Sequence, residues 1–244
     1  MDFDTDVKEP FINYKDEEEN NNEIFGIQRN IRSGFISKVY GIIAFQVLLT
    51  SLVVYLAFVN PSFKKLLLTS VSMFYTCLII SLICVLLPIC FRGIYQNVPI
   101  NYIVLIIFTL SYSWDVAAIT CTYTFSSVMI ALLLTFITVV SLSIYAMKTK
   151  EDFTIVGGTL FVCMILLIFI SIIYIIIPLQ FLYLIYLYGS LICFCIYLIY
   201  DTQLIMGEGR IKFSEDDYIL AAINIYLDII ILFLKILQIF GKKD

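Results

Sequence analysis

The sequence predicts an all-α membrane protein, a bundle of seven transmembrane helices. Of its 244 residues, 61% are hydrophobic and 14% are charged, whereas a typical soluble domain has about 45–50% apolar and about 25% charged residues. The apolar residues gather into long runs without charge, and about 20 such residues span the hydrocarbon core of a bilayer as a helix. These runs lack the alternation of polar and apolar residues that a transmembrane β-barrel requires.

The first two predicted spans are separated by a short polar linker. Residues 39–59 and 71–91 each form a run of 21 residues without a charge. Asn60, Lys64 and Lys65 lie between them. The lengths of both runs match a single crossing of the bilayer.

Spans three and four lie in one stretch of 48 residues, from 100 to 147, in which Asp115 is the only charge. This stretch is too long for one crossing and is right for two that are joined by a short polar turn. The polar residues near 121–127 supply that turn. We therefore expect helices at about 100–120 and 126–147.

Spans five and six lie in a second uncharged stretch of 48 residues, from 153 to 200. Pro178 interrupts it near the middle, as a proline between two helices does. The expected helices are therefore about 155–177 and 181–203. The last span is expected at about 218–240.

Residues 1–30 form an acidic tail without apolar periodicity. Within residues 1–28, nine Asp or Glu stand against two Lys. A segment with high net charge and few apolar residues cannot bury enough surface to fold. We expect this tail to be disordered in the cytosol and residues 31–244 to form the membrane domain.

The orientation follows from the Lys and Arg residues near the ends of the spans, which are enriched on the cytosolic side. With the N-terminus in the cytosol, eight of them face the cytosol and four face the other side. The eight are Arg29, Arg32, Lys38, Arg92, Lys148, Lys150, Arg210 and Lys212, and the four are Lys64, Lys65, Lys242 and Lys243. We therefore predict a cytosolic N-terminus.

The composition excludes several classes of chemistry. The chain contains no histidine, which excludes catalytic triads that use one, histidine-ligated zinc or haem, and pH sensing by imidazole. Tyr200 and Asp201 match half of the intramembrane aspartyl protease signature, but G-x-G-D is missing because I-Y-L precedes Asp228. We expect no enzyme activity, no cofactor and no fixed metal site.

Two carboxylates at membrane depth are the first functional candidates, because burying a charge there is costly. Asp201 closes span six, and Asp228 lies about 15 Å from the same face of the membrane at 1.5 Å per residue. Adjacent antiparallel helices would bring the two carboxyl groups together, where they would share a proton and act as a cation site or a latch. The alternative is that Asp201 is solvated at the interface and Asp228 only hydrogen-bonds between helices.

Asp115 and Lys235 are the other two ionisable residues at membrane depth. They lie about 23 Å and about 26 Å from the cytosolic face by the same rise per residue. Because they are nearly level, we expect a buried ion pair between them. A retinal protein would also place Asp in span three and Lys in span seven, but the chain has one tryptophan, Trp114, where a retinal pocket usually has several.

Four motifs resemble the Bax inhibitor motif family, in its lifeguard branch. They are I-R-S-G-F-I-S-K-V-Y-G at 31–41, Y-D-T-Q-L-I-M-G at 200–207, S-E-D-D-Y-I-L-A-A-I-N-I-Y-L-D-I-I at 214–230 and L-Q-I-F-G at 237–241. Further agreement includes K-T-K-E-D-F-T at 148–154. The resemblance covers about residues 30–241.

The resemblance implies six helices around a central seventh, a pH-sensitive Ca²⁺ leak from an intracellular store, calcium homeostasis and suppression of cell death. It implies that Asp201 and Asp228 form a proton-sensitive latch near which Ca²⁺ passes. It also matches Arg92 to an arginine that is associated with this latch in bacterial relatives, although Arg92 could equally be an orientation anchor. The expected location is the endoplasmic reticulum or Golgi, with the plasma membrane as the alternative.

This chain departs from the family pattern at Asp115 and Lys235, which replace residues that are usually uncharged. A fixed pair at that depth would alter the permeation pathway. The competing function is a non-conducting protein that modulates other channels or apoptosis regulators. Expected partners are the lipid bilayer, Ca²⁺ and such regulators, and no nucleic acid.

Overall fold

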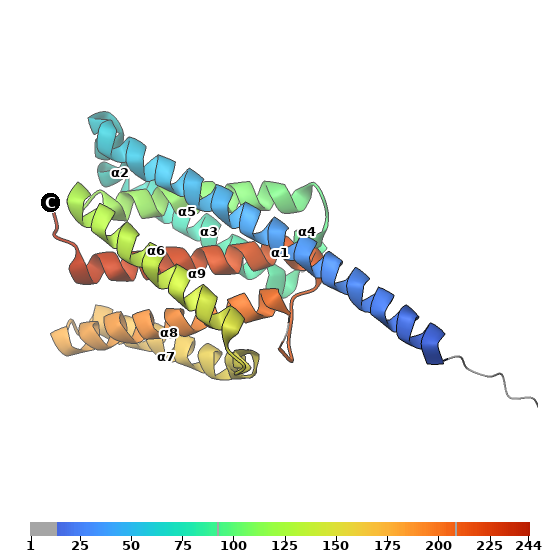
Figure 1. Ribbon diagram of the computed structural model, residues 1–244. Coiled ribbons are helices and arrows are strands. Elements are labelled where there is room, and N and C mark those ends of the chain that lie inside the picture. Colours follow the sequence, from blue (N-terminus) through green and yellow to red (C-terminus); the bar gives the residue numbers. More distant parts are fainter. Residues whose placement is uncertain (1–13, 92, 208) are drawn as a thin grey trace, which may run out of the picture.

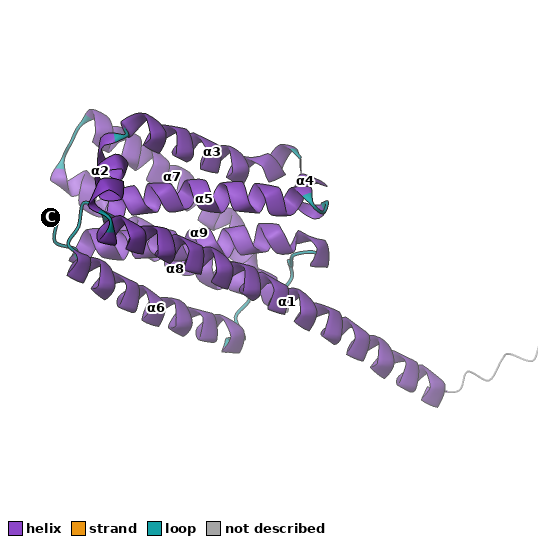
Figure 2. Cartoon of the chain, turned by 90° about the horizontal axis from the view of Figure 1, so that it is seen from above, coloured by secondary structure: helices purple, strands orange, loops and turns teal. Residues whose placement is uncertain are grey.

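The computed structural model describes residues 14–91, 93–207 and 209–244. Figure 1 shows long helices gathered side by side into a bundle, from which the N-terminal part of α1 projects. The described residues form helices and turns and no β-strand (Figure 2). The helices are α1 (Tyr14–Val59), α2 (Pro61–Thr69), α3 (Val71–Cys90), α4 (Gly93–Gln96), α5 (Ile100–Thr120), α6 (Phe125–Lys148), α7 (Gly157–Ile176), α8 (Gln180–Met206) and α9 (Tyr218–Phe240), with 3₁₀ turns η1 (Phe153–Val156) and η2 (Glu215–Asp217).

Within the described residues, seven helices are long and apolar enough to cross a membrane: α1, α3, α5, α6, α7, α8 and α9. This confirms the all-α class and the predicted number of spans. The ends of α3, α5, α6, α7, α8 and α9 lie within a few residues of the predicted ones. The agreement arises because charges, prolines and polar linkers end each apolar run, and the same residues end each helix.

The first helix differs from the prediction. α1 begins at Tyr14, so in the structure residues 14–30, for which the sequence predicted disorder, continue the helix. Once the apolar part of α1 is helical, each further residue adds one hydrogen bond without a new nucleation step. Acidic residues near a helix N-terminus are also favoured by the helix dipole. The remainder of the predicted tail, residues 1–13, lies outside the described residues.

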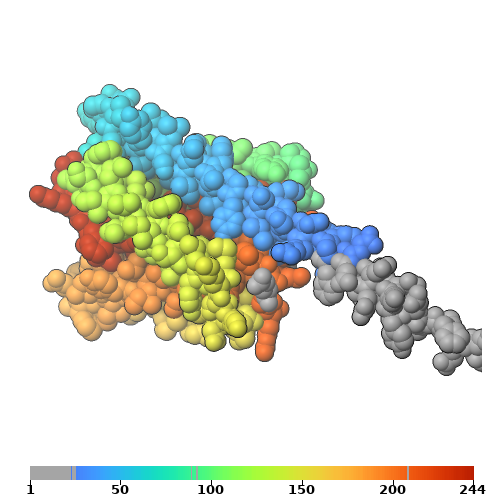
Figure 3. Space-filling model, in the orientation of Figure 1, coloured from blue at the N-terminus to red at the C-terminus, as the bar shows by residue number. Residues whose placement is uncertain are grey.

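α9 is the central helix of the bundle. In its most apolar stretch 67% of the residues are buried, against 11% in the spans formed by α3 and α7. α9 packs against α1, α5, α6 and α8, whereas α3 packs on α5 and α7 packs on α8. On the face drawn in Figure 3, α1 and α6 cover most of α9. The outer helices turn large apolar side chains to the lipid, among them Ile175 and Phe181, which are 79% and 71% exposed.

The two ends of the bundle carry different connections. One end carries the link between α8 and α9 and is called the 207–217 end. The other is the C-terminal end, where residues 241–244 lie beside the turn between α5 and α6. The backbone N–H of Thr124 donates to the carbonyl of Lys242 over 3.0 Å, and the carboxylate of Asp244 pairs with Lys64 at 2.9 Å.

Candidate functional site

The centre of the site is a pair of buried carboxyl groups. Asp201 of α8 and Asp228 of α9 are 5% and 4% exposed. The structure brings their side chains within hydrogen-bonding reach of each other. The antiparallel packing of α8 on α9 places the last turns of one helix beside the first turns of the other.

The surroundings of this pair are mostly apolar, although the Tyr197 hydroxyl lies near both carboxyl groups and the Cys193 thiol lies near Asp228. Buried side chains of α1, α8 and α9 form a cluster around the helices that carry it: Phe35, Val39, Ile43, Phe194, Leu198, Ile205, Ala221, Ala222, Ile225 and Leu232. One oxygen of Asp228, Oδ2, has no hydrogen-bond partner among the described residues. Two carboxylates held this close without compensating groups repel each other, so close contact between them requires that the pair hold at least one proton.

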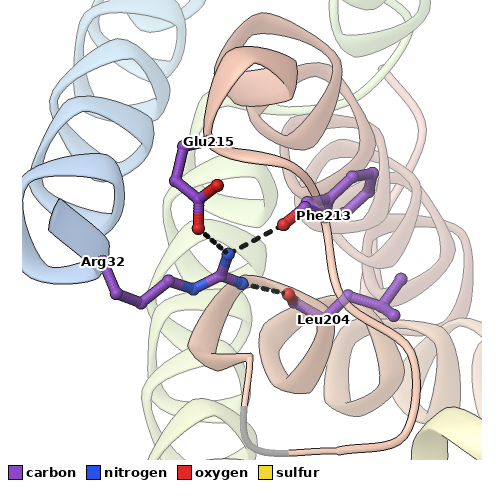
Figure 4. A network of polar contacts seen from close by, with 4 residues as sticks. All are labelled: Arg32, Leu204, Phe213 and Glu215. Carbon is purple, nitrogen blue, oxygen red and sulfur yellow. Dashed lines mark hydrogen bonds and ion pairs between the residues drawn. The ribbon is translucent and has the colours of Figure 1, made fainter. Parts of the chain in front are cut away.

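A guanidinium from α1 holds the connection between the two helices that carry the pair. Figure 4 shows the Arg32 side chain reaching from α1 to the end of α8 and to the following loop. Its Nη2 donates to the carbonyl of Leu204 at 2.6 Å, and its Nη1 donates to the carbonyl of Phe213 at 2.8 Å. Nη1 also lies 3.7 Å from a carboxylate oxygen of Glu215. Arg32 therefore joins three segments of the chain at the 207–217 end.

Gly207 makes this arrangement possible. It ends α8 in the left-handed conformation, with φ of 74°, and its backbone N–H donates to the carbonyl of Gln203. A Cβ at this position would lie 2.7 Å from the Arg32 guanidinium. Glycine is therefore required both for its conformation and for the close approach of Arg32.

A second set of hydrogen bonds ties the 149–156 segment to α8. The side-chain oxygen of Gln203 accepts from the backbone N–H of Phe153 at 2.8 Å, and its Nε2 donates to the carbonyl of Glu151 at 2.9 Å. Asp152 accepts from the Thr154 hydroxyl at 2.6 Å and from the backbone N–H of Arg210 at 3.1 Å. These hydrogen bonds, led by that of Thr154, lower the pKa of the Asp152 carboxyl.

The predicted ion pair between Asp115 and Lys235 is absent from the described residues, so that prediction is wrong. Both carboxylate oxygens of Asp115 lack a hydrogen-bond partner there, and its side chain lies near Cys77 of α3. The Nζ of Lys235 lies 3.8 Å from the centre of the Tyr186 ring of α8. The two residues are at a similar depth but point into different helix interfaces, and a depth calculation does not determine rotation about a helix axis.

Arg92 lies outside the described residues, so its role in the latch stays a prediction. The roles of Arg32 and Gln203 were missed. Arg32 was counted only as an orientation charge, and Gln203 only as part of a motif. Their partners are mostly backbone carbonyls and N–H groups, which a sequence does not distinguish, although Arg32 lies in the matched motif at 31–41 and Gln203 in the one at 200–207.

An uncharged polar cluster between α1, α5 and α9 was also not predicted, because its members carry no charge. The Thr50 hydroxyl lies 2.7 Å from that of Tyr226 and 2.8 Å from that of Ser113. Gln46, which is fully buried, donates to the Thr109 hydroxyl at 3.0 Å. These hydrogen bonds fix α9 against α1 and α5, and one of their members, Tyr226, lies two residues before Asp228 along α9.

Comparison with known proteins adds a family relationship. Residues 32–244 match the family model described as "Inhibitor of apoptosis-promoting Bax1". The chain is 34% identical over 221 residues to Protein lifeguard 3 of Mus musculus, covering 88% of this chain and 71% of the relative. It is 34% identical over 223 residues to Protein lifeguard 3 of Homo sapiens, with the same coverage. It is 39% identical over 222 residues to Protein LIFEGUARD 4 of Arabidopsis thaliana, covering 88% of this chain and 87% of the relative.

Proposed function

This chain belongs to the Bax inhibitor family, in its lifeguard branch, and we propose that it is a pH-sensitive, Ca²⁺-permeable leak channel of an intracellular membrane. The family is anti-apoptotic, and the proposed role of the leak is to set the calcium content of a store and so suppress cell death. The lysines and arginines near the span ends support a cytosolic 207–217 end. The endoplasmic reticulum or the Golgi is the proposed location.

The observation that carries this proposal is the buried contact between Asp201 and Asp228. When the pair holds one proton, a hydrogen bond joins α8 to α9 and closes the path between them. When both carboxyls lose their protons, their charges repel each other and offer oxygen ligands of the kind that Ca²⁺ prefers. The channel therefore opens as the pH rises.

The contacts of Arg32 and Gln203 support the same mechanism. Both side chains hold the end of α8, immediately after Asp201 along the chain. Because that end is fixed, repulsion between the carboxyls acts to separate the facing surfaces of α8 and α9. Opening of the channel thus requires no unfolding of the 207–217 connection.

The test is a Ca²⁺ flux assay with purified protein in liposomes, at several pH values between about 6 and about 8, because burial and a neighbouring like charge move the titration of a carboxyl pair toward neutrality. Flux through the unmodified protein should rise with pH. Asp201→Asn and Asp228→Asn should each flatten this dependence, because one neutral amide removes the repulsion. Asp216→Asn is the matched control, since Asp216 is an exposed acid at the same end of the bundle.

An unchanged pH profile in both variants would refute the latch. Absence of flux at every pH, in protein shown to be folded by circular dichroism, would refute the channel. That result would favour a non-conducting protein that acts on other channels or on apoptosis regulators.

A further inference from the structure

Lys235 carries a buried positive charge without a negative partner. Its side chain lies near the C-terminal end of α9 and is 6% exposed. The ion pairs recorded among the described residues involve Arg32 and Lys64, and none involves Lys235. The ring of Tyr186, 3.8 Å from Nζ, offers a cation–π contact, which compensates only part of the cost of a charge at membrane depth.

The ammonium group of Lys235 borders a cavity of 300 Å³ between α7, α8 and α9. Most of its wall is apolar and includes Met164 and Ile168 of α7 and Phe194 of α8. Ile168 is 52% exposed, so this wall extends to the outer surface of the bundle. A lipid chain in the surrounding bilayer can therefore reach the cavity from the side.

A second cavity, of 550 Å³, adjoins the first at the C-terminal end of the bundle. The two share Ser171, Tyr186 and Gln238 as lining residues. The second cavity is also bordered by Lys243, which adds a second cation. The acid next to it in the sequence, Asp244, is paired with Lys64. The combined cleft is thus apolar along α7 and cationic toward its mouth.

The positions of these residues along the helices support the division of the cleft into an apolar part along α7 and a cationic mouth. Lys235 precedes the last residue of α9, Phe240, by five positions, which is about 8 Å along a helix axis. Its flexible stem can direct the ammonium toward the membrane surface. Tyrosines at this end, including Tyr174 and Tyr183 with ring centres 5.6 Å apart, are typical of the region where lipid head groups begin.

We propose that this cleft binds one anionic phospholipid. An acyl chain lies along the apolar wall, and the phosphate lies at Lys235, with Lys243 at the mouth. Hydroxyl groups of the lining tyrosines and the amide of Gln238 donate hydrogen bonds to the phosphate oxygens. The negative charge of an anionic lipid balances the positive charge of the buried ammonium. A zwitterionic lipid also carries a positive group, which would lie close to that ammonium. The site is independent of the carboxyl pair and of the proposed channel.

Native mass spectrometry of the purified full-length chain tests this proposal, with phosphatidylglycerol and phosphatidylcholine added in equal amounts. The unmodified protein should retain one phosphatidylglycerol in preference to phosphatidylcholine. Lys235→Met should bind it at least about tenfold more weakly, which corresponds to about 1.4 kcal/mol. Lys235→Arg keeps the charge and should keep most of the binding. Lys65→Met is the matched control, because Lys65 is exposed at the same end and borders neither cavity.

A second variant keeps the charge of Lys235 and fills the cavity between α7, α8 and α9. Ile168→Trp places a larger ring on the apolar wall, and the exposed position of Ile168 makes the substitution compatible with folding. It should also weaken retention of phosphatidylglycerol. This variant keeps the test decisive if Lys235→Met fails to fold.

Three results would overturn the proposal. Equal losses in Lys65→Met and Lys235→Met would show that the lipid is held by diffuse surface charge. Equal retention of phosphatidylcholine and phosphatidylglycerol would show that the head-group charge is not recognised. The third result concerns the melting temperature in detergent. If inorganic phosphate, added without lipid, raises it as much as phosphatidylglycerol does, the ligand is a free anion.

Discussion

The guanidinium of Arg32 and the carbonyl of Leu204 are joined by a hydrogen bond of 2.6 Å, although 172 residues separate them along the chain. Leu204 lies in the last turn of α8, three residues after Asp201. α1 therefore holds the end of the helix that carries one of the two paired carboxyls. This contact makes α1 part of the candidate site, although α1 supplies no residue to the carboxyl pair.

Replacement of Arg32 should loosen the 207–217 connection. Arg32→Ala removes two hydrogen bonds from a charged donor and should lower the free energy of unfolding by about 2 kcal/mol. Arg32→Lys should recover only part of this loss, because an ammonium cannot reproduce the geometry of the guanidinium fork. Thermal unfolding in detergent and limited proteolysis of residues 207–217 measure the two effects.

The control for this prediction is Arg29→Ala. Arg29 lies on the same helix and is exposed, so its loss should leave both measurements nearly unchanged. Equal proteolysis of Arg32→Ala and the unmodified protein would contradict the prediction.

Gly207→Ala should destabilise the fold for two reasons. A left-handed conformation costs a residue with a Cβ about 1–2 kcal/mol, and this Cβ would lie 2.7 Å from the Arg32 guanidinium. In an Arg32→Ala background the close contact disappears but the conformational cost remains, so the substitution should be less harmful there. Melting temperatures of the four proteins measure this difference.

Gly26→Ala is the opposite case. Gly26 lies within α1, and a Cβ there would meet nothing within 4 Å. Alanine should therefore stabilise the helix by up to about 1 kcal/mol. A larger loss of stability from Gly26→Ala than from Gly207→Ala would contradict the account of both positions.

Asp152 should make stability depend on pH in the acid range. Its pKa is lowered in the folded protein, first by the hydrogen bond from Thr154. Because the pKa of Asp152 is lower in the folded protein than in the unfolded one, the ionised carboxylate stabilises the fold at pH values above the unfolded pKa of about 3.9. This stabilisation is lost as the pH falls through the folded pKa. Asp152→Asn should therefore lower the melting temperature at neutral pH and have little effect once the unmodified carboxyl is protonated.

The control for Asp152 is Glu151→Gln at the neighbouring exposed position. Glu151 contributes only its backbone carbonyl to Gln203, so this change should leave the pH dependence of the melting temperature intact. A difference between Asp152→Asn and the unmodified protein that stays constant down to pH of about 2, below the ordinary range of Asp, would contradict the prediction.

The sequence predicted the parts of this fold that depend on composition. Uncharged runs and the polar residues between them located α5 at 100–120, and the structure has the same bounds. The approach of Asp201 to Asp228 was also predictable, because α8 and α9 are consecutive and antiparallel, and Asp201 precedes the end of α8 by five residues while Asp228 follows the start of α9 by ten. The role of Arg32 was not, since its acceptors are the carbonyls of Leu204 and Phe213. Any residue supplies a carbonyl, so only the folded backbone identifies these two.

The separation of Asp115 from Lys235 leads to the last prediction. Sequence spacing placed them level but did not determine which neighbours each helix turns them toward. Asp115 lies near Cys77 of α3, and Lys235 lies over Tyr186 of α8.

Because Asp115 and Lys235 share no partner, the effects of Asp115→Asn and Lys235→Met on the free energy of unfolding should add to within about 0.5 kcal/mol. Each substitution removes an unpaired ionisable group from membrane depth, so neither should behave as the loss of half an ion pair, which typically costs about 3–5 kcal/mol. A double-mutant cycle in phosphatidylcholine nanodiscs, which contain no anionic lipid, provides the measurement. A coupling energy above about 1 kcal/mol, in the range found for residues in contact, would restore the ion pair and remove the unpaired ammonium on which the lipid site depends.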